Sequence, residues 1–408
     1  MLKEDTVEES KIHSTKKSLW NRSYIYLMLV SLITNMGFNM VYVIISKYAL
    51  RISDSLSIAG IIAGMFSISA LVVRPLAGVT VDRVNKKQLC ILANILIGIS
   101  LVGYSLSRNV PMLFFFRVLH GASFGLGSTV NIALVTQYIP KDRMGEGLAY
   151  YGLGQVVAQV VSPSLGVYIE GRYGFSLLFL MIALLSFTGA GLLTRLDYTK
   201  DNKGLGPIEK GQRPRLSLNS LIAKEVIVYA MVGGIFSFSN GIVSSFLILL
   251  GEDRNIANVS LFFSLGAIVL FVLRLFVGRL VDKQGLSLIV NIALILTAGS
   301  MVLIGIAPSL LILLLASVLK SMGQGTGQIA LQTESIKRVD PARVGVATST
   351  FYIGADIGQG FGPMVGGRIS DSFGYGTLFF VCACLILATM LLFNIYQRKS
   401  SVSYANKS

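Results

Sequence analysis

The sequence predicts an all-α membrane protein with twelve transmembrane helices in two pseudo-symmetric six-helix halves. Of its 408 residues, 53% are hydrophobic and 13% are charged, and the mean hydropathy is +0.70, which is too apolar for a soluble protein. Its apolar runs approach or exceed the roughly 20 residues that a helix needs to cross about 30 Å of hydrocarbon. Residues of special geometry also recur at a constant shift along the chain. Because a lipid-facing backbone must satisfy its own hydrogen bonds, helices are expected rather than an open sheet.

Polar residues divide the apolar sequence into the twelve expected spans. The spans lie at about 23–46, 57–79, 88–107, 110–136, 145–168, 174–195, 224–249, 257–280, 286–307, 309–334, 343–367 and 374–397. The first 22 residues lack the pattern of a signal peptide, so the first span is expected to stay in the protein. The predicted division is an N-terminal tail (1–22), a first half (23–195), a linker (196–223), a second half (224–397) and a C-terminal tail (398–408).

The excess of positive charge predicts how the chain lies in the membrane. The net charge is +15, and Lys and Arg gather in the two tails, in the linker and in the loops on the same side as these segments. The positive-inside rule therefore places both termini in the cytoplasm, and the expected location is the cell (plasma) membrane. Because the positive charge is explained by topology, a nucleic-acid partner is not expected. The three cysteines, Cys90, Cys382 and Cys384, fall inside predicted spans without metal-ligand spacing, so neither a metal nor a cofactor is expected.

A repeated sequence predicts the two halves. The stretch "RPLAGVTVDR" begins at Arg74, and "RLFVGRLVDK" begins two hundred residues later at Arg274. The same shift relates other residues of special geometry or charge: Gly125 and Gly325, Gly127 and Gly327, Arg143 and Arg343, Gly154 and Gly354, Pro163 and Pro363, Gly174 and Gly374, and Phe179 and Phe379. So many pairs at one shift indicate two halves built on one plan.

Several of these residues resemble signatures of the major facilitator superfamily. The signature that this family carries in the loop between its second and third helices has a counterpart here in Gly78, Asp82, Arg83, Lys86 and Lys87, which resemble it. The signature of its fourth helix is resembled by Arg117 and Gly121. Its antiporter signature belongs in helix 5, but here a similar glycine ladder lies in helix 11: Gly354, Gly358, Gly362, Pro363, Gly366 and Gly367. The resemblance covers essentially the whole chain. It implies the major facilitator fold and, within it, the drug:proton antiporter branch of multidrug and metabolite exporters.

The repeated stretch predicts a gate at the cytoplasmic side. Gly78 and Gly278 would let helix ends approach closely. Carboxylates there can meet the positive N-terminus of a helix. The two-fold symmetry of the halves then places Asp82 near Arg343 and Asp282 near Arg143 when the cytoplasmic side is shut, and Arg83 belongs to the same predicted gate. The alternative is that these charges mark topology alone. Arg74 and Arg274 are expected to reach toward the interface as anchors.

Polar side chains recur every three or four residues in six of the spans, which puts each set on one helix face. Together with the apolar Phe124, these polar residues are expected to line a substrate cavity: Asn35, Asn39, Tyr42, Arg117, Gln155, Gln159, Asn240, Lys320, Gln324, Gln328, Tyr352 and Asp356. The alternative for any single amide is that it joins two helices, at ~0.6 kcal/mol each. Because polar groups are costly in hydrocarbon, six such stripes favour a water-accessible cavity between the halves.

The charges deepest in the spans predict the coupling chemistry. Asp356 is the one deep carboxylate, so it is the best candidate to take up and release a proton; the alternative is a permanent ion pair with Lys320 or Arg117. Arg117 stays charged, and by resemblance it would tune the proton carrier or hold a substrate anion. His120 is either a proton relay or a hydrogen-bonded structural residue. Two cations, one histidine and one acid favour neutral, zwitterionic or anionic amphiphiles over lipophilic cations.

The leading hypothesis is proton-coupled efflux of a small amphiphilic organic compound by alternating access. The expected partners are that compound, protons and the lipid bilayer, and the protein is expected to act as a monomer. The alternatives are an importer or uniporter for an organic anion or sugar, and a lipid flippase with a cavity that opens sideways to the bilayer. An enzyme is not expected, because the spans contain a single His and neither paired carboxylates nor a nucleophile motif.

Overall fold

The computed structural model describes residues 19–81, 84–140, 143–196, 222–340 and 343–405, and the elements in these ranges are helices. The α-helices are α1 (Arg22–Ser53), α2 (Leu56–Val81), α3 (Lys86–Leu106), α4 (Val110–Val135), α5 (Met144–Thr194), α7 (Ile227–Asp253), α8 (Leu261–Gln284), α9 (Leu286–Ile306), α10 (Leu310–Lys337) and α11 (Val344–Ala405). Two short 3₁₀ helices, η1 (Thr136–Tyr138) and η3 (Lys224–Val226), adjoin α4 and α7. The predicted all-α membrane fold is confirmed.

Three of the helices in the first half begin at an asparagine. Asn21, Asn85 and Asn109 precede α1, α3 and α4, and each side-chain oxygen accepts a hydrogen bond from a backbone N–H of the first turn, at 2.8, 3.3 and 3.0 Å respectively. The first turn of a helix has unpaired N–H groups, and an asparagine at this position satisfies one of them. These capping residues explain why the helices start at the polar boundaries of the apolar runs.

Two helices are long enough to cross a membrane twice. α5 has 51 residues and α11 has 62, and each contains one glycine with non-helical backbone angles, Gly174 at φ 84° and Gly374 at φ 79°. Glycine adopts positive φ without steric cost, so the chain turns there without ending its helical run. The two glycines are related by the shift of the sequence repeat, and each stands at the start of a predicted span. In the described ranges, nine helices are long and apolar enough to span a membrane, so twelve crossings stay a prediction.

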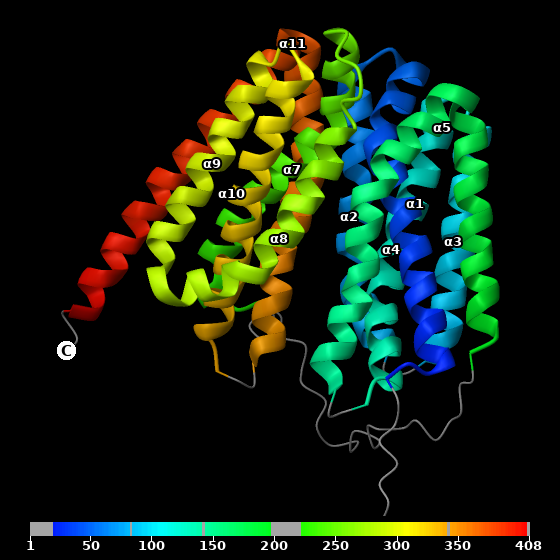
Figure 1. Ribbon diagram of the computed structural model, residues 1–408, viewed down its shortest axis with the longest axis horizontal. Coiled ribbons are helices and arrows are strands. Elements are labelled where there is room, and N and C mark those ends of the chain that lie inside the picture. Colours follow the sequence, from blue (N-terminus) through cyan, green and yellow to red (C-terminus); the bar gives the residue numbers. More distant parts are fainter. Residues whose placement is uncertain (1–18, 82–83, 141–142, 197–221, 341–342, 406–408) are drawn as a thin grey trace, which may run out of the picture.

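The helices run between two ends of one bundle (Figure 1). α1 begins and α11 ends at what we call the terminal end, and the turns after α1 and α3 lie at the opposite end, the far end. Helices α1 to α5 gather on one side of the molecule and α7 to α11 on the other. The helix pairs α2 and α11, α5 and α8, and α1 and α7 make most of the contacts between these two groups.

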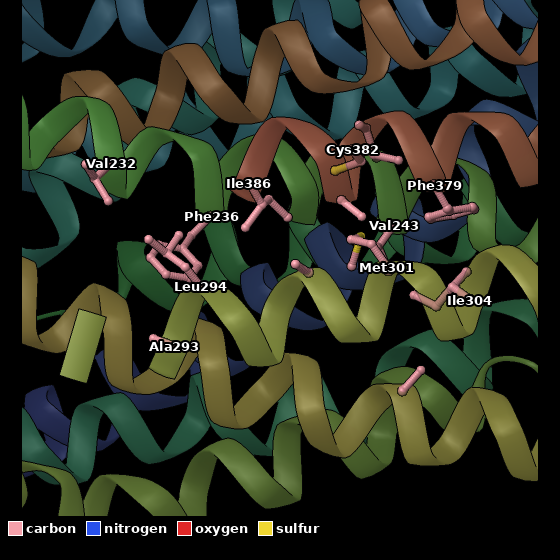
Figure 2. Packing of buried hydrophobic residues seen from close by; sticks show 14 of the residues in the cluster. Val232, Phe236, Val243, Ala293, Leu294, Met301, Ile304, Phe379, Cys382 and Ile386 are labelled. Atoms are coloured by element: carbon pink, nitrogen blue, oxygen red, sulfur yellow. The ribbon is translucent and has the colours of Figure 1, made fainter. Parts of the chain in front are cut away.

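Buried apolar side chains form separate clusters on the two sides. The largest cluster runs from Ala223 to Phe393, whereas two others run from Met40 to Ala183 and from Leu19 to Leu196. Figure 2 shows the largest of them, where Phe236 of α7, Leu294 of α9 and Ile386 of α11 point toward one another. Each side of the bundle therefore has its own core.

Candidate functional site

The deep carboxylate of Asp356 joins the two sides of the bundle. Its Oδ2 atom lies 2.9 Å from Nη1 of Arg74, so an ion pair connects α11 to α2. The two side chains are only 16% and 33% exposed, which strengthens their attraction relative to a surface pair. The expected alternative of a pair with Lys320 or Arg117 is wrong in this structure. The expectation that Arg74 merely reaches toward the interface is also wrong, because Arg74 turns inward to the carboxylate.

Lys320 lies buried among amides rather than beside an acid. Its ammonium donates to Oδ1 of Asn240 at 2.8 Å and to Oε1 of Gln324 at 2.7 Å. The Asn240 amide nitrogen lies 3.3 Å from the Tyr42 hydroxyl and 3.3 Å from Oε1 of Gln359. Helices α10, α7, α11 and α1 thus meet at one polar cluster. Four of its members, Tyr42, Asn240, Lys320 and Gln324, are among the predicted cavity residues.

Arg117 holds α4 against the backbone of α2. It is 2% exposed, and its guanidinium donates to the carbonyl oxygens of Ile62 (3.1 Å) and Ala63 (3.2 Å) while lying 4.7 Å from the ring centre of Phe66. Two hundred residues later Ser317 donates to the carbonyl of Phe262 at 2.6 Å, which is the equivalent contact in the second half. The structure therefore places Arg117 in helix packing, away from Asp356.

His120 lies beside Arg117 but has a different set of neighbours. Its Nδ1 lies 3.0 Å from the Tyr104 hydroxyl, and its ring meets Phe66 edge to face. These contacts favour the structural alternative that the sequence left open for His120, because no acid contacts the ring in the described residues. The expected cluster of Asp356, Arg117 and His120 is not brought together.

An aromatic wall stands next to the polar cluster. Phe38 stacks on Tyr42 at a ring distance of 5.2 Å and on Phe124 at 4.7 Å, and Phe66 packs against both Phe38 and Phe124. Aromatic stacks of this kind present a wide apolar surface. Because Tyr42 also touches Asn240, the wall and the polar cluster share one residue.

A second charged contact between the two sides lies at the far end. Nζ of Lys47 in α1 is 2.8 Å from Glu170 of α5 and 2.7 Å from Glu252 of α7. Asp371 of α11 accepts hydrogen bonds at the start of α2, from the hydroxyls of Ser57 (2.7 Å) and Ser55 (3.2 Å) and from two backbone N–H groups. The acids in these contacts were missed by the sequence analysis. They stand at the ends of spans, but spacing along one chain does not reveal which helix they face.

The inter-half contacts in the described residues are therefore concentrated away from the terminal end. Lys47 and Asp371 join the two sides at the far end, Tyr42 and Asn240 join them deeper in the bundle, and the pair of Arg74 with Asp356 lies further toward the terminal end.

Comparisons with known proteins show the family of this bundle. A family model described as the Major Facilitator Superfamily matches residues 27–333 and again residues 231–407. The chain belongs to the major facilitator superfamily. It is therefore a multi-pass membrane transporter and not an enzyme, as the sequence predicts. The two matches overlap, as expected for a superfamily built from two similar halves.

Individual relatives place the chain within the superfamily. It is 26% identical over 356 residues to the multi-drug resistance efflux pump PmrA of Streptococcus pneumoniae, which covers 83% of this chain and 86% of that protein. It is 22% identical over 349 residues to the staphylopine export protein of Staphylococcus aureus, covering 82% and 86%. The nucleoside transporter NupG has a similar fold, with a TM-score of 0.77 at 13% identity, covering 92% of this chain and 99% of that one. The predicted resemblance to superfamily exporters is confirmed.

The glycine ladder that resembles the superfamily's antiporter signature packs α11 on two neighbours. A methyl group on Gly354, Gly358 or Gly362 would overlap the backbone of α7. Gly367 instead lies against Leu56 of α2, where Pro363 also meets Gly60, and Gly366 lies against the Phe246 ring of α7. The ladder thus permits close backbone approach both within the second half and across to the first. Its role in antiport stays a prediction.

The superfamily's gate signature is only partly described. Asp82 and Arg83 lie outside the described residues, as do the side chains at positions 78–83 and 274–284, which include Gly78, Gly278 and Asp282. Arg143 binds Glu146 of its own helix at 2.7 Å, and Arg343 lies 3.4 Å from Glu225 in the second half. The predicted contacts of the two aspartates with these arginines therefore stay predictions.

The other predicted cavity residues do not share one set of neighbours. Asn35 and Asn39 donate back to carbonyl oxygens of α1 itself, and Gln328 donates to Ser237 of α7. Gln155 and Tyr352 are exposed, and Gln159 is half-buried. The structure thus gathers only part of the predicted cavity set around Lys320.

An apolar hollow of about 240 Å³ lies between α5 and α8, which belong to different halves. Its lining is entirely apolar and comprises Leu153, Val156, Val157, Val160, Val161 and Phe271. Most of these side chains are also exposed at the surface of the bundle. The hollow therefore faces the lipid rather than the polar cluster.

Arg117→Met is expected to lower stability. The variant keeps most of the side-chain volume but removes two charged hydrogen bonds to α2, each worth about 1.5–3 kcal/mol. Thermal unfolding of the purified protein in detergent should show a lower midpoint, whereas Arg108→Met, at an exposed position, should leave the midpoint unchanged. Equal midpoints for Arg117→Met and wild type would contradict the packing role.

Proposed function

We propose that this transporter exports a small amphiphilic organic compound from the cell by alternating access and couples export to proton entry at Asp356. The observation that carries the proposal is the pair of Arg74 with Asp356, which joins the two halves inside the membrane-spanning region. Protonation of Asp356 removes the charge that attracts Arg74. The proton therefore changes how strongly α2 and α11 hold together, which is the differential interaction that a coupled transporter requires.

The direction of transport is supported by the relatives and by topology. Two of them are named as an efflux pump and an export protein. If the terminal end is cytoplasmic, as the positive-inside rule predicts, the contacts of Lys47 and Asp371 close the outer side of the bundle. Among the described residues these charged contacts lie away from the cytoplasmic side, which suits an exporter that takes its substrate from the cytoplasm. Opening outward requires these contacts to break.

Transport by purified protein in proteoliposomes tests the proposal. Wild type, with a pH gradient imposed in either direction, would be compared on neutral, zwitterionic, anionic and cationic amphiphiles of matched chain length. We expect substrate movement opposite to the proton flow, and none when a proton carrier collapses the gradient. Movement that follows the substrate gradient alone would favour a uniporter and would overturn proton coupling.

The apolar hollow between α5 and α8 supports a second candidate, a lipid flippase. Its lining is apolar and its rim is exposed, so an acyl chain could lie between the halves. Transfer of a fluorescent phospholipid between leaflets of the same proteoliposomes distinguishes the two functions. We expect no transfer above protein-free vesicles if the chain exports small molecules.

A further inference from the structure

Lys320 is a buried cation without an acidic partner. Its side chain is 7% exposed, and it takes part in none of the ion pairs between described residues. Two amide oxygens, of Asn240 and Gln324, accept its hydrogen bonds. Withdrawing an ammonium from water costs several kcal/mol, and neutral acceptors offset only part of that cost. The cluster therefore holds a net positive charge that an anion would neutralise.

The same cluster contains donors without acceptors. An ammonium has three N–H donors, and Lys320 uses two. Nε2 of Gln359 is buried and has no hydrogen-bond partner, although Oε1 of the same amide accepts from Asn240. Turning the Gln359 amide over would place its NH₂ against the NH₂ of Asn240, and Asn240 is itself oriented by Lys320. The unused donors are therefore held in place by the network.

These donors stand where the two halves meet. Asn240 of the second half touches both Gln359 and Lys320, and it also touches Tyr42 of the first half. Asp356 lies one helical turn from Gln359, but Arg74 already binds its carboxylate. In the first half the position equivalent to Lys320 is His120, whose ring nitrogen faces a tyrosine hydroxyl. The excess of donors thus belongs to the second half.

We propose that Lys320, Gln359 and Asn240 form a subsite for a single carboxylate on the transported compound. This proposal rests on the proposed transport of a small organic molecule and names its chemical class. One ammonium balances one negative charge, and the spare donors of Lys320 and Gln359 match the two oxygens of a carboxylate. Tyr42 and the stacked Phe38 lie beside the cluster, so an apolar chain or ring attached to the carboxylate would contact the aromatic wall.

Equilibrium binding to the purified full-length protein tests the subsite without any proton gradient. The probes are decanoate and decanamide, which differ only in the charged group, with decyl phosphate and decyltrimethylammonium as further charged probes. Charge-assisted hydrogen bonds are stronger than neutral ones, so we expect wild type to bind decanoate roughly tenfold more tightly than decanamide. We expect the phosphate to bind less tightly than the carboxylate, since one ammonium balances a single charge.

Two variants and one control identify the residues. Lys320→Met is expected to abolish the preference for decanoate, and Gln359→Leu, which removes the spare amide donors, is expected to reduce it. Gln332→Leu is the matched control, since Gln332 lies on the same helix as Lys320 but donates to the Tyr352 hydroxyl, and it is expected to keep the full preference. Unfolding midpoints near that of wild type would show that the variants are folded.

The outcomes separate this subsite from the transport proposal. Equal binding of decanoate and decanamide by wild type, or an unchanged preference in folded Lys320→Met and Gln359→Leu, overturns the subsite. A clear carboxylate preference in binding with no proton-driven movement in proteoliposomes upholds the subsite and overturns coupled export. Proton-driven export of all amphiphiles alike, without a binding preference, upholds coupled export and overturns the subsite.

Discussion

Asp356→Asn is expected to abolish proton-driven transport while leaving the protein folded. The amide keeps the shape of the carboxylate and can still accept a hydrogen bond from Arg74, but it cannot exchange a proton or attract the guanidinium by charge. Since removing the charge of Asp356 weakens a partly buried contact between α2 and α11, the balance between the two arrangements of the halves is also expected to change. The measurement is substrate movement in proteoliposomes with an imposed pH gradient, compared with wild type at equal protein content.

The control for this prediction is Glu334→Gln. Glu334 also forms an ion pair, with Arg338 at 2.6 Å, but both residues lie at the end of α10 and do not connect the halves. We expect gradient-driven transport by this variant to match wild type. If Asp356→Asn also transports at the wild-type rate, Asp356 is not the proton carrier and the coupling must lie elsewhere.

Gly64→Ala is expected to separate the two halves at the far end. Gly64 lies where α2 meets α11, and a methyl group there would overlap the carbonyl oxygen of Gly360. Overpacking of a tight contact costs roughly 1–3 kcal/mol. That cost applies only while α2 and α11 are in contact at this point. It is therefore expected to shift the equilibrium by roughly 5- to 150-fold toward the arrangement in which the two helices have parted.

Distances between two spin labels measure this change. Arg108 and Ala257 are exposed, stand at the far end and belong to different halves, so a cysteine at each would carry a label once the native cysteines have been replaced. We expect the Gly64→Ala protein to show a larger population of long distances than wild type. Gly191→Ala is the control, because a methyl group at Gly191 meets no atom within 4 Å. Identical distance distributions in the three proteins would mean that the α2 contact does not control closure.

Much of the fold could be predicted because membrane helices have few alternatives. Apolar runs of sufficient length must be helical in lipid, and the repeat of glycines, prolines and arginines indicated two similar halves. The glycines with positive φ, Gly174 and Gly374, stand at starts of predicted spans, and the contact of Arg117 with Ile62 has its equivalent in Ser317 and Phe262. Positions that repeat in the sequence thus have similar backbone angles and similar helix contacts in the two halves.

The candidate site was predicted in part. Helical spacing identified Tyr42, Asn240, Lys320 and Gln324, which meet in one cluster. The depth of their charges in the spans also grouped Asp356 with Arg117 and His120, but the structure pairs Asp356 with Arg74 instead. A helix-face pattern states which side of a helix avoids lipid, but it does not state which neighbour that side meets.

The sequence by itself determined that this protein is a membrane-embedded helical transporter in two similar halves, because the hydrophobic effect and backbone hydrogen bonding act on each segment separately. Only the tertiary structure decided which charges pair. Arg74 binds Asp356 and Lys47 binds Glu252 across the two halves, and the residues of each pair lie about two hundred or more positions apart in the chain. Such partners depend on the register and rotation of packed helices, which are set by the sum of many small side-chain and glycine contacts between them.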